Sequence, residues 1–169
     1  MRKNFGAKPF LYPQPVLIIA TYDKDGTPNA MNAAWGGISN STQISICLSE
    51  EHKTVKNILE RGAFTVNMAD AAHVVECDYI GIVSANDVPN KFEKSGLHAV
   101  KSEFVDAPVI EELRMALECK LISYDKESGA LVGEIINVSA DEEVLSADEK
   151  IDTSKFIPIT FDPVNNAYL

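Results

Sequence analysis

The chain has 169 residues, enough for one domain with a substantial core, and 46% of them are hydrophobic. Its 25 acidic residues against 15 Lys and Arg give a formal charge of −10, which opposes binding to nucleic acid and to anionic membrane surfaces. The longest uninterrupted apolar run, Val16 to Ala20, has the length of a strand and falls far short of a membrane span. We therefore expect a single domain over residues 1–169, with neither nucleic acid nor membrane as a partner.

The N-terminal region predicts the location of the protein, and the cysteine spacing bears on metal binding. Arg2 and Lys3 are followed by a proline-crowded region, and no apolar stretch leads to a small-residue cleavage site, so we expect a cytoplasmic protein. The three cysteines, Cys47, Cys77 and Cys119, have no paired or metal-ligand spacing, so we expect no metal site. Because Cys47 and Cys119 lie in strand-like patterns, we expect both to be buried free thiols.

The first part of the chain predicts three strands. An apolar run at 15–22 reads as a buried strand that turns at 23–26, and 29–35 would return beside it. The segment 43–49 alternates, with Ile44, Ile46 and Leu48 on one face. Strict alternation of this kind is typical of a strand with one buried face.

A short helix and a further strand follow. Thr54 is a good N-cap, and Val55, Ile58 and Leu59 share one helical face before Gly62 ends the helix. Residues 64–68 again alternate as in a strand.

The second half predicts one more helix and three more strands. Residues 70–80 read as a helix, and 83–109 as a long irregular segment of the length that tends to form a functional lid or a partner contact. Residues 115–121 and 131–138 form the clearest hairpin, and 156–161 a last short strand. Some six strands with two helices, joined by tight turns, predict a small antiparallel barrel.

One cluster of residues is suited to hold a phosphate. A helix beginning at Thr54 would offer unpaired backbone N–H groups and the positive end of its dipole. His52 and Lys53 add donors beside it, and Lys53 adds full charge. The alternative is that Thr54 only caps the helix while its two neighbours are solvated, and capping alone is the commoner role of such a threonine.

The segment before it is suited to meet a flat, hydrogen-bonding ring such as the isoalloxazine of FMN. Asn29 and Asn32 can donate or accept, and the extended backbone from Met31 to Trp35 can pair with a ring edge as a strand would. The small Ala33 and Ala34 let that backbone approach closely. Trp35 could pack on the ring or fill the barrel, and the core position is the commoner one for an isolated tryptophan.

Further segments continue this order along the chain. They are Pro15-Val16, Asp25-Gly26-Thr27-Pro28, Asn57-Ile58, Gly62-Ala63-Phe64-Thr65-Val66-Asn67, Asp87-Val88-Pro89-Asn90-Lys91-Phe92, Leu117-Glu118-Cys119, Gly133-Glu134-Ile135 and Pro158-Ile159. With the two clusters above, they resemble the flavin reductase-like, FMN-binding split-barrel family over nearly the whole chain. Gly133-Glu134, where many flavin reductases carry Gly-Asp, resembles the flavoredoxin-like branch.

The resemblance implies a mainly β, Greek-key antiparallel split barrel with a few short helices, which binds FMN at the interface of a homodimer. It implies that Ser49 and the strand 31–35 line the flavin, that His52, Lys53 and Thr54 hold its phosphate, and that Lys91 contacts the phosphate or the ring. The alternative for Lys91 is an exposed side chain in a mobile loop. The expected cofactor-binding residues are Asn29, Met31, Asn32, Ala33, Ala34, Trp35, Ser49, His52, Lys53, Thr54 and Lys91.

The expected activity is that of an FMN-dependent oxidoreductase. It would pass electrons from NADH, NADPH or a protein donor to a small molecule or a protein. No amino-acid catalytic residue is expected, because the flavin supplies the reduction chemistry. The chain has no Rossmann-type glycine fingerprint, so a nicotinamide would have to stack directly on the flavin. The alternatives are an FMN electron carrier that does not react with nicotinamides, a pyridoxamine-phosphate oxidase-like enzyme, and a flavin-free split-barrel dimer with a binding role.

Overall fold

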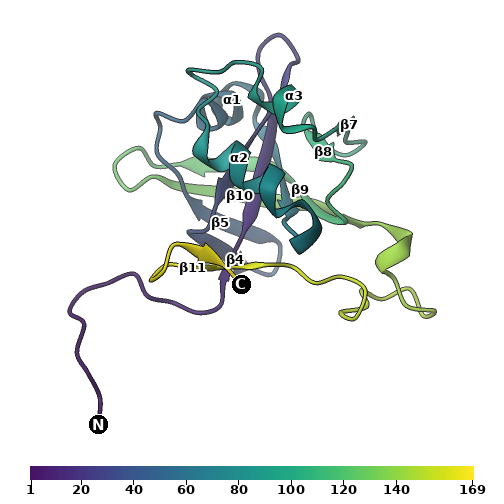
Figure 1. Cartoon of the computed structure of the whole chain (residues 1–169). Coiled ribbons are helices and arrows are strands. Elements are labelled where there is room, and N and C mark those ends of the chain that lie inside the picture. The colour runs from purple at the N-terminus through teal and green to yellow at the C-terminus, as the bar shows by residue number, and fades with distance from the viewer.

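Seven strands form one curled antiparallel sheet (Figure 1). The computed structural model describes residues 1–169, and the strands follow the order β3-β2-β6-β9-β10-β5-β4. They are β2 (Leu17–Tyr22), β3 (Pro28–Ala33), β4 (Gly36–Asn40), β5 (Gln43–Cys47), β6 (Ala63–Met68), β9 (Met115–Tyr124) and β10 (Ala130–Ala140). The predicted mainly β split barrel is confirmed.

Smaller elements surround this sheet. The helices are α1 (Lys53–Arg61), α2 (Val74–Ile82) and α3 (Lys91–Ser95), with 3₁₀ turns at η1 (Ala71–His73) and η2 (Glu142–Val144). Strand β1 (Gln14–Pro15) pairs with β11 (Thr160–Asp162), which pairs with β12 (Ala167–Tyr168); β7 (Ala99–Lys101) pairs with β8 (Pro108–Ile110). None of the helices combines the length and apolar character needed to cross a bilayer.

The two outer strands of the sheet are neighbours in the sequence. β3 lies at one edge and β4 at the other, yet only Ala34 and Trp35 separate them in the chain. A sheet whose opposite edges are joined by two residues must curl until those edges lie near each other. The edges are not hydrogen-bonded to each other, so the barrel stays open along β3.

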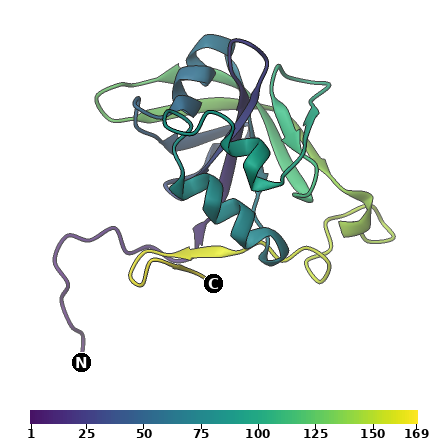
Figure 2. The same ribbon diagram turned by 45° about the horizontal axis from the view of Figure 1, so that its top comes forward.

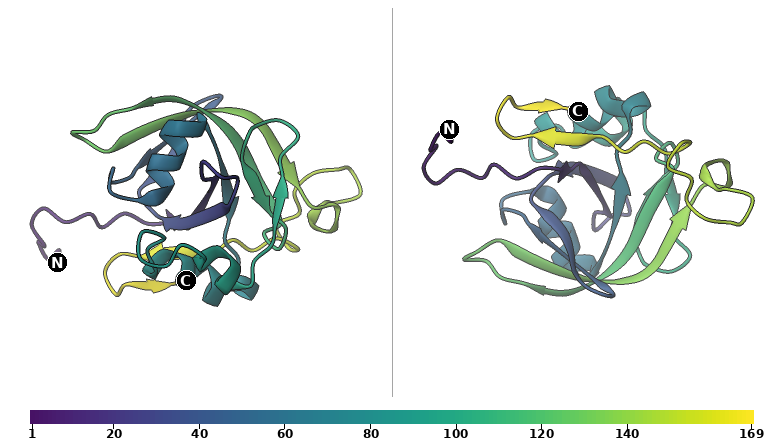
Figure 3. Two further views of the ribbon diagram at one scale, coloured as in Figure 1. Left: turned by 90° about the horizontal axis from the view of Figure 1, so that it is seen from above. Right: turned by 90° about the horizontal axis from the view of Figure 1, so that it is seen from below.

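Strand β2 divides the interior into two cores, because successive side chains point to opposite faces. Leu17 and Ile19 face the inside of the barrel together with Val55 and Ile58 of α1. Ile18 instead faces the second core, which includes residues of α2 and α3. Figure 3 shows the barrel along its axis, and Figure 2 shows it from another side. In these views α1 lies within the curled sheet. Its outside is covered by α2, α3 and the C-terminal hairpin, which is formed by β11 and β12. This continuous burial of β2 explains its uninterrupted apolar run.

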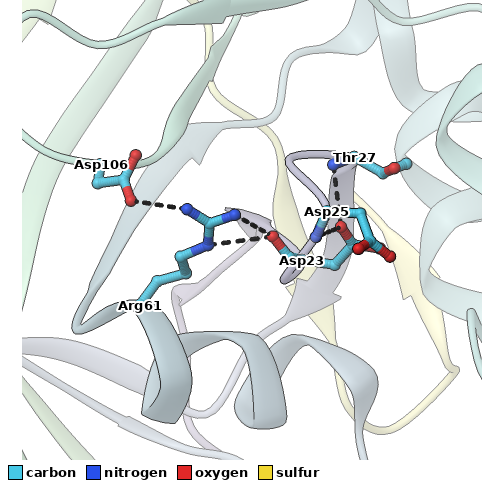
Figure 4. Close-up of polar contacts among 5 residues, drawn as sticks. All are labelled: Asp23, Asp25, Thr27, Arg61 and Asp106. Atoms are coloured by element: carbon cyan, nitrogen blue, oxygen red, sulfur yellow. Dashed lines mark hydrogen bonds and ion pairs between the residues drawn. The ribbon is translucent and has the colours of Figure 1, made fainter.

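The C-terminal end of α1 is hydrogen-bonded to the loop between β2 and β3. Arg61, in the last turn, donates from Nε to the carbonyl oxygen of Asp23 at 3.0 Å and from Nη1 to Asp106 at 3.1 Å (Figure 4). The carboxylate of Asp23 accepts the backbone N–H groups of Asp25 and Thr27, both at 2.9 Å, which closes the turn. These contacts hold the helix against the strand β3 that begins just after this turn, and so fix where its N-terminus lies.

The last strand, expected at 156–161, begins only at Thr160, and the expectations for 83–109 and for Cys47 are wrong. The segment 83–109 is not irregular: it contains α3, β7 and the start of β8, and Phe92 and Leu97 pack in the second core. Cys47 is exposed, whereas Cys119 is buried as expected. Cys47 ends β5 on the face opposite Ile44 and Ile46, so its own strand alternation directs it away from the core.

Candidate functional site

Two adjoining cavities lie where the barrel is open. The larger encloses about 650 Å³ and is lined by β3 and the residues after it, the end of β5, α2 and the C-terminal hairpin. The smaller encloses about 210 Å³ and continues to the N-terminus of α1 and the loop after α2. Four residues line both cavities: Met31, His52, Gly81 and Ile82. The two cavities therefore form one elongated site, with a large end and a small end.

The small cavity contains the start of α1. His52 is the N-cap residue and makes no side-chain cap, so the prediction that Thr54 is the N-cap is wrong by two positions. The first helical hydrogen bond runs from Lys56 N–H to the His52 carbonyl at 3.2 Å, which leaves the N–H groups of Lys53, Thr54 and Val55 without backbone partners. Free amides at the positive end of a helix dipole, next to a lysine, favour an anion.

Thr54 is held by Asn29 rather than by its own helix. Asn29 Nδ2 donates to Thr54 Oγ1 at 2.8 Å, and both side chains are buried. Since the oxygen of Thr54 accepts this bond, its hydroxyl hydrogen is available to a ligand. Asn29 itself lines neither cavity; it lies in a third pocket of about 240 Å³ with Lys53 and Asn86, where its Oδ1 atom is buried without a partner. The structure thus places Asn29 behind Thr54, away from the large cavity.

Lys91 begins α3 and lies in the wall of the small cavity. It is only 3% exposed, and its Nζ donates to the carbonyl oxygens of Ile80 at 2.7 Å and Val83 at 2.8 Å. Two of its three N–H donors therefore hold the end of α2, and one is left for a ligand. Burial lowers its pKa to about 8. The alternative of an exposed lysine in a mobile loop is excluded.

His52 contributes a hydrogen-bonding group rather than a charge. Desolvation lowers the pKa of its imidazole, and the positive charge of Lys91 lowers it further. The ring is consequently neutral at pH 7, with one N–H donor and one acceptor nitrogen. The full positive charges at the small end of the site come from Lys53 and Lys91.

The large cavity presents peptide groups and an aromatic face. Along one wall run Met31, Asn32, Ala33, Ala34 and Trp35, which also form the free edge of β3 and its link to β4. Trp35 is 44% exposed and lines the cavity, as expected of a site residue, and does not take the core position that is commoner for an isolated tryptophan. A flat ring can lie against this wall with its edge toward the backbone.

The ends of two neighbouring segments complete that side. Cys47 and Ser49 line the same cavity and are both exposed. The Ser49 carbonyl accepts the N–H of His52 at 3.2 Å, a turn that joins the large cavity to the helix N-terminus. Ten of the eleven expected site residues thus line the two cavities, and Asn29 supports one of them.

The opposite wall was not predicted. It consists of Asp78, Gly81 and Ile82 from α2 and Phe161 and Tyr168 from the C-terminal hairpin. A glycine inside an apolar helix was the one local signal: a Cβ at position 81 would lie 2.8 Å from the Cβ of Asn32. Nothing in the sequence indicates that the C-terminus folds back here, because that contact is tertiary.

Comparison with known proteins agrees with this geometry. The model of the flavin reductase-like domain matches residues 10–161. The chain superposes on the flavoredoxin of Desulfovibrio vulgaris (Miyazaki F) with a TM-score of 0.95 and 40% identity, covering 100% of this chain and 92% of that one. A flavoredoxin from Methanosarcina acetivorans gives 0.89 and 26%, covering 100% and 90%.

A relative without an assigned function also aligns with most of this chain. A protein of Aquifex aeolicus (strain VF5) is 27% identical over 159 residues, which is 87% of this chain and 79% of the relative. The nitrilotriacetate monooxygenase component B from Bacillus cereus, at 21% identity and a TM-score of 0.79, shares the fold. With the family model matching most of the chain, this protein belongs to the flavin reductase-like domain family.

Proposed function

We propose that the chain is an FMN-binding oxidoreductase that passes electrons from NADH, NADPH or a protein donor to a small-molecule or protein acceptor. The observation that carries this proposal is the direct connection between a helix N-terminus with free amides and a large cavity lined by a free strand edge. FMN combines a phosphate with a flat ring, and the site offers a matching environment for each. The similarity to two flavoredoxins supports the same cofactor.

The residues of each end fit the group assigned to it. At the small end, Lys53, Thr54 and Lys91 supply charge and donors, and the neutral His52 supplies one more N–H. At the large end, Met31–Trp35 and Ser49 form the surface for the ring. The flavin, when bound, supplies the reduction chemistry, while the chain sets its orientation, its electrostatic surroundings and the access of other reactants.

The site is open enough for a second reactant. Trp35, Cys47 and Ser49 are exposed at the large cavity, so a nicotinamide or a redox protein can reach the ring from this side. The same opening fits a second candidate function, an electron carrier that receives its electrons only from a protein. The similarity of this chain to two flavoredoxins supports that second candidate as well.

We also infer a homodimer as the working form. Ile38 of β4 and Ile136 and Val138 of β10 are exposed apolar side chains on the two strands that flank β5. Large exposed apolar side chains are candidates for an interface, and the family resemblance implies a homodimer. Sedimentation equilibrium of the flavin-loaded protein should give twice the mass of one chain, and a monomer at all concentrations would contradict the dimer.

The phosphate assignment predicts a large effect from two side chains. Replacing Lys53→Ala together with Thr54→Val removes a charge and a hydroxyl donor, and should weaken FMN binding by about 100-fold or more, because each of the two lost charge-assisted hydrogen bonds contributes about 1.5–3 kcal/mol. Quenching of flavin fluorescence measures the Kd. Lys56→Ala, an exposed lysine on the same helix outside the cavity, is the matched control and should leave the Kd within about twofold. Equal Kd values for the double variant and the control would show that the phosphate does not bind at the N-terminus of this helix.

The lowered pKa of Lys91 predicts a pH dependence of binding. An anion favours the charged amine, so affinity should be full below pH 8 and should fall by up to about tenfold per pH unit as the free protein loses this proton above pH 8. The phosphate remains a dianion throughout this range, since its second pKa is about 6. FMN titrations from pH 7 to pH 9.5 measure the effect. Lys91→Met should flatten the profile, and an unchanged slope in that variant would show that another group causes it.

The function itself is tested by an anaerobic absorbance titration of the FMN-loaded protein with NADH and then NADPH. Bleaching of the bound flavin by either nucleotide is the expected result and identifies the preferred donor. A flavin that stays oxidised until dithionite is added would instead establish the electron carrier. A protein that does not take up FMN at all would overturn both and favour the flavin-free dimer.

A further inference from the structure

Three polar side chains from distant parts of the chain form a continuous chain of hydrogen bonds in the wall of the large cavity. Tyr168 of β12 donates its O–H to Asp78 of α2 at 2.7 Å. Asn32 of β3 donates from Nδ2 to the Tyr168 oxygen at 3.0 Å and to the carbonyl oxygen of Cys77 at 3.4 Å. All three side chains line the cavity assigned above to the ring.

The direction of each bond in this chain is determined by chemistry. The Asp78 carboxylate and the Cys77 carbonyl can only accept, and a phenol has a single hydrogen to donate. Burial raises the pKa of Tyr168, and its bond to Asp78 raises it further, so the phenol keeps its proton. Tyr168 therefore gives its hydrogen to Asp78 and accepts from Asn32, which commits both hydrogens of the Asn32 amide.

The group that Asn32 has left is its carbonyl oxygen. Oδ1 of Asn32 accepts no hydrogen bond from the protein, whereas Nδ2 has two partners. The side chain is also confined, since Gly81 lies so close that an added Cβ would be 2.8 Å from the Asn32 Cβ. In isolation an asparagine can present either polarity to a ligand; here only the acceptor is free.

We propose that Asp78 and Tyr168 are positioning residues that orient Asn32 so that the large cavity presents an acceptor, which selects a ring carrying an N–H at that point. This inference rests on the proposed function, since the ring is that of FMN. Oxidised isoalloxazine has a single ring N–H, at N3 of its pyrimidine part, and the Asn32 oxygen is assigned to it. Neither Asp78 nor Tyr168 needs to touch the flavin for this selection.

The test compares FMN with 3-methyl-FMN, in which the N3–H is replaced by a methyl group. Wild-type protein should bind FMN about 10- to 100-fold more tightly, because the methylated ring leaves the Asn32 oxygen unpaired. In Tyr168→Phe and in Asp78→Ala the amide is released and can turn its N–H toward the ring, so this ratio should fall below about threefold. Fluorescence titration of both flavins gives the ratio without any turnover.

A matched control exists next to the same small sheet, which is formed by β1, β11 and β12. Tyr12 also donates its O–H to an aspartate, Asp162, between the N-terminal segment and β11, but it does not contact Asn32. Tyr12→Phe should therefore keep the wild-type ratio even if it loosens the C-terminal hairpin. Loss of the ratio in Tyr12→Phe as well would mean that hairpin packing, and not the polarity of Asn32, is responsible, and would overturn the proposal.

The outcomes separate this inference from the proposed function. Failure of the wild-type protein to bind either flavin would overturn the FMN site and the inference with it. Tight binding of both flavins with equal Kd would leave the FMN site standing and overturn only the inference. A ratio that survives in Tyr168→Phe and Asp78→Ala would show that these two residues do not determine the polarity of Asn32, which also overturns the inference. In Asn32→Ala the ratio should be lost, and a ratio that survives there would show that shape alone excludes the methyl group, which overturns the inference as well.

Discussion

The candidate site exists because the two edges of the sheet are joined by only two residues. Ala34 and Trp35 bring β3 and β4 together, yet the edges do not pair, and the unpaired backbone of β3 would be a liability if nothing covered it. Here α2 and the C-terminal hairpin lie across from this edge and leave a cavity between them. The same feature that curls the sheet thus supplies the peptide groups for a ligand, and the other parts of the site are arranged around it.

The small end of the site contains two lysines, although the chain as a whole is strongly negative. With a net charge of −10, the protein repels anions at long range, so a phosphate must be held by local groups at short distance. Lys53 provides a partly exposed charge, whereas Lys91 is buried and carries the cost of desolvation that lowers its pKa. Two carbonyl oxygens at the end of α2 offset part of that cost. The buried amine therefore links the folding of α2 and α3 to the binding of an anion.

Local patterns predicted what local physics decides. The alternation of Ile44 and Ile46 identified β5, and Gly62, with φ near 69°, ends α1 as expected. Tertiary contacts overrode two common local roles: Trp35 lines a cavity, as its place in the expected site requires, and Thr54, expected to be the N-cap, accepts from Asn29 instead of capping its helix. For Cys47 the alternation of its own strand pointed the right way, and the general preference of cysteine for burial did not.

The wall formed by Asp78 and Tyr168 could not be found from sequence, because no periodicity relates positions 90 residues apart. Its contribution also differs in kind from that of the β3 edge. A strand edge offers alternating donors and acceptors to any ring of suitable shape, so it provides affinity without strong selection. A side-chain amide whose hydrogens are both committed offers one polarity only, and leaving it unpaired costs about 1–3 kcal/mol. In the proposal made above, the amide of Asn32 in β3 selects the ring, and its polarity is determined from the α2 and C-terminal side of the cavity, by residues that the strand pattern does not reveal.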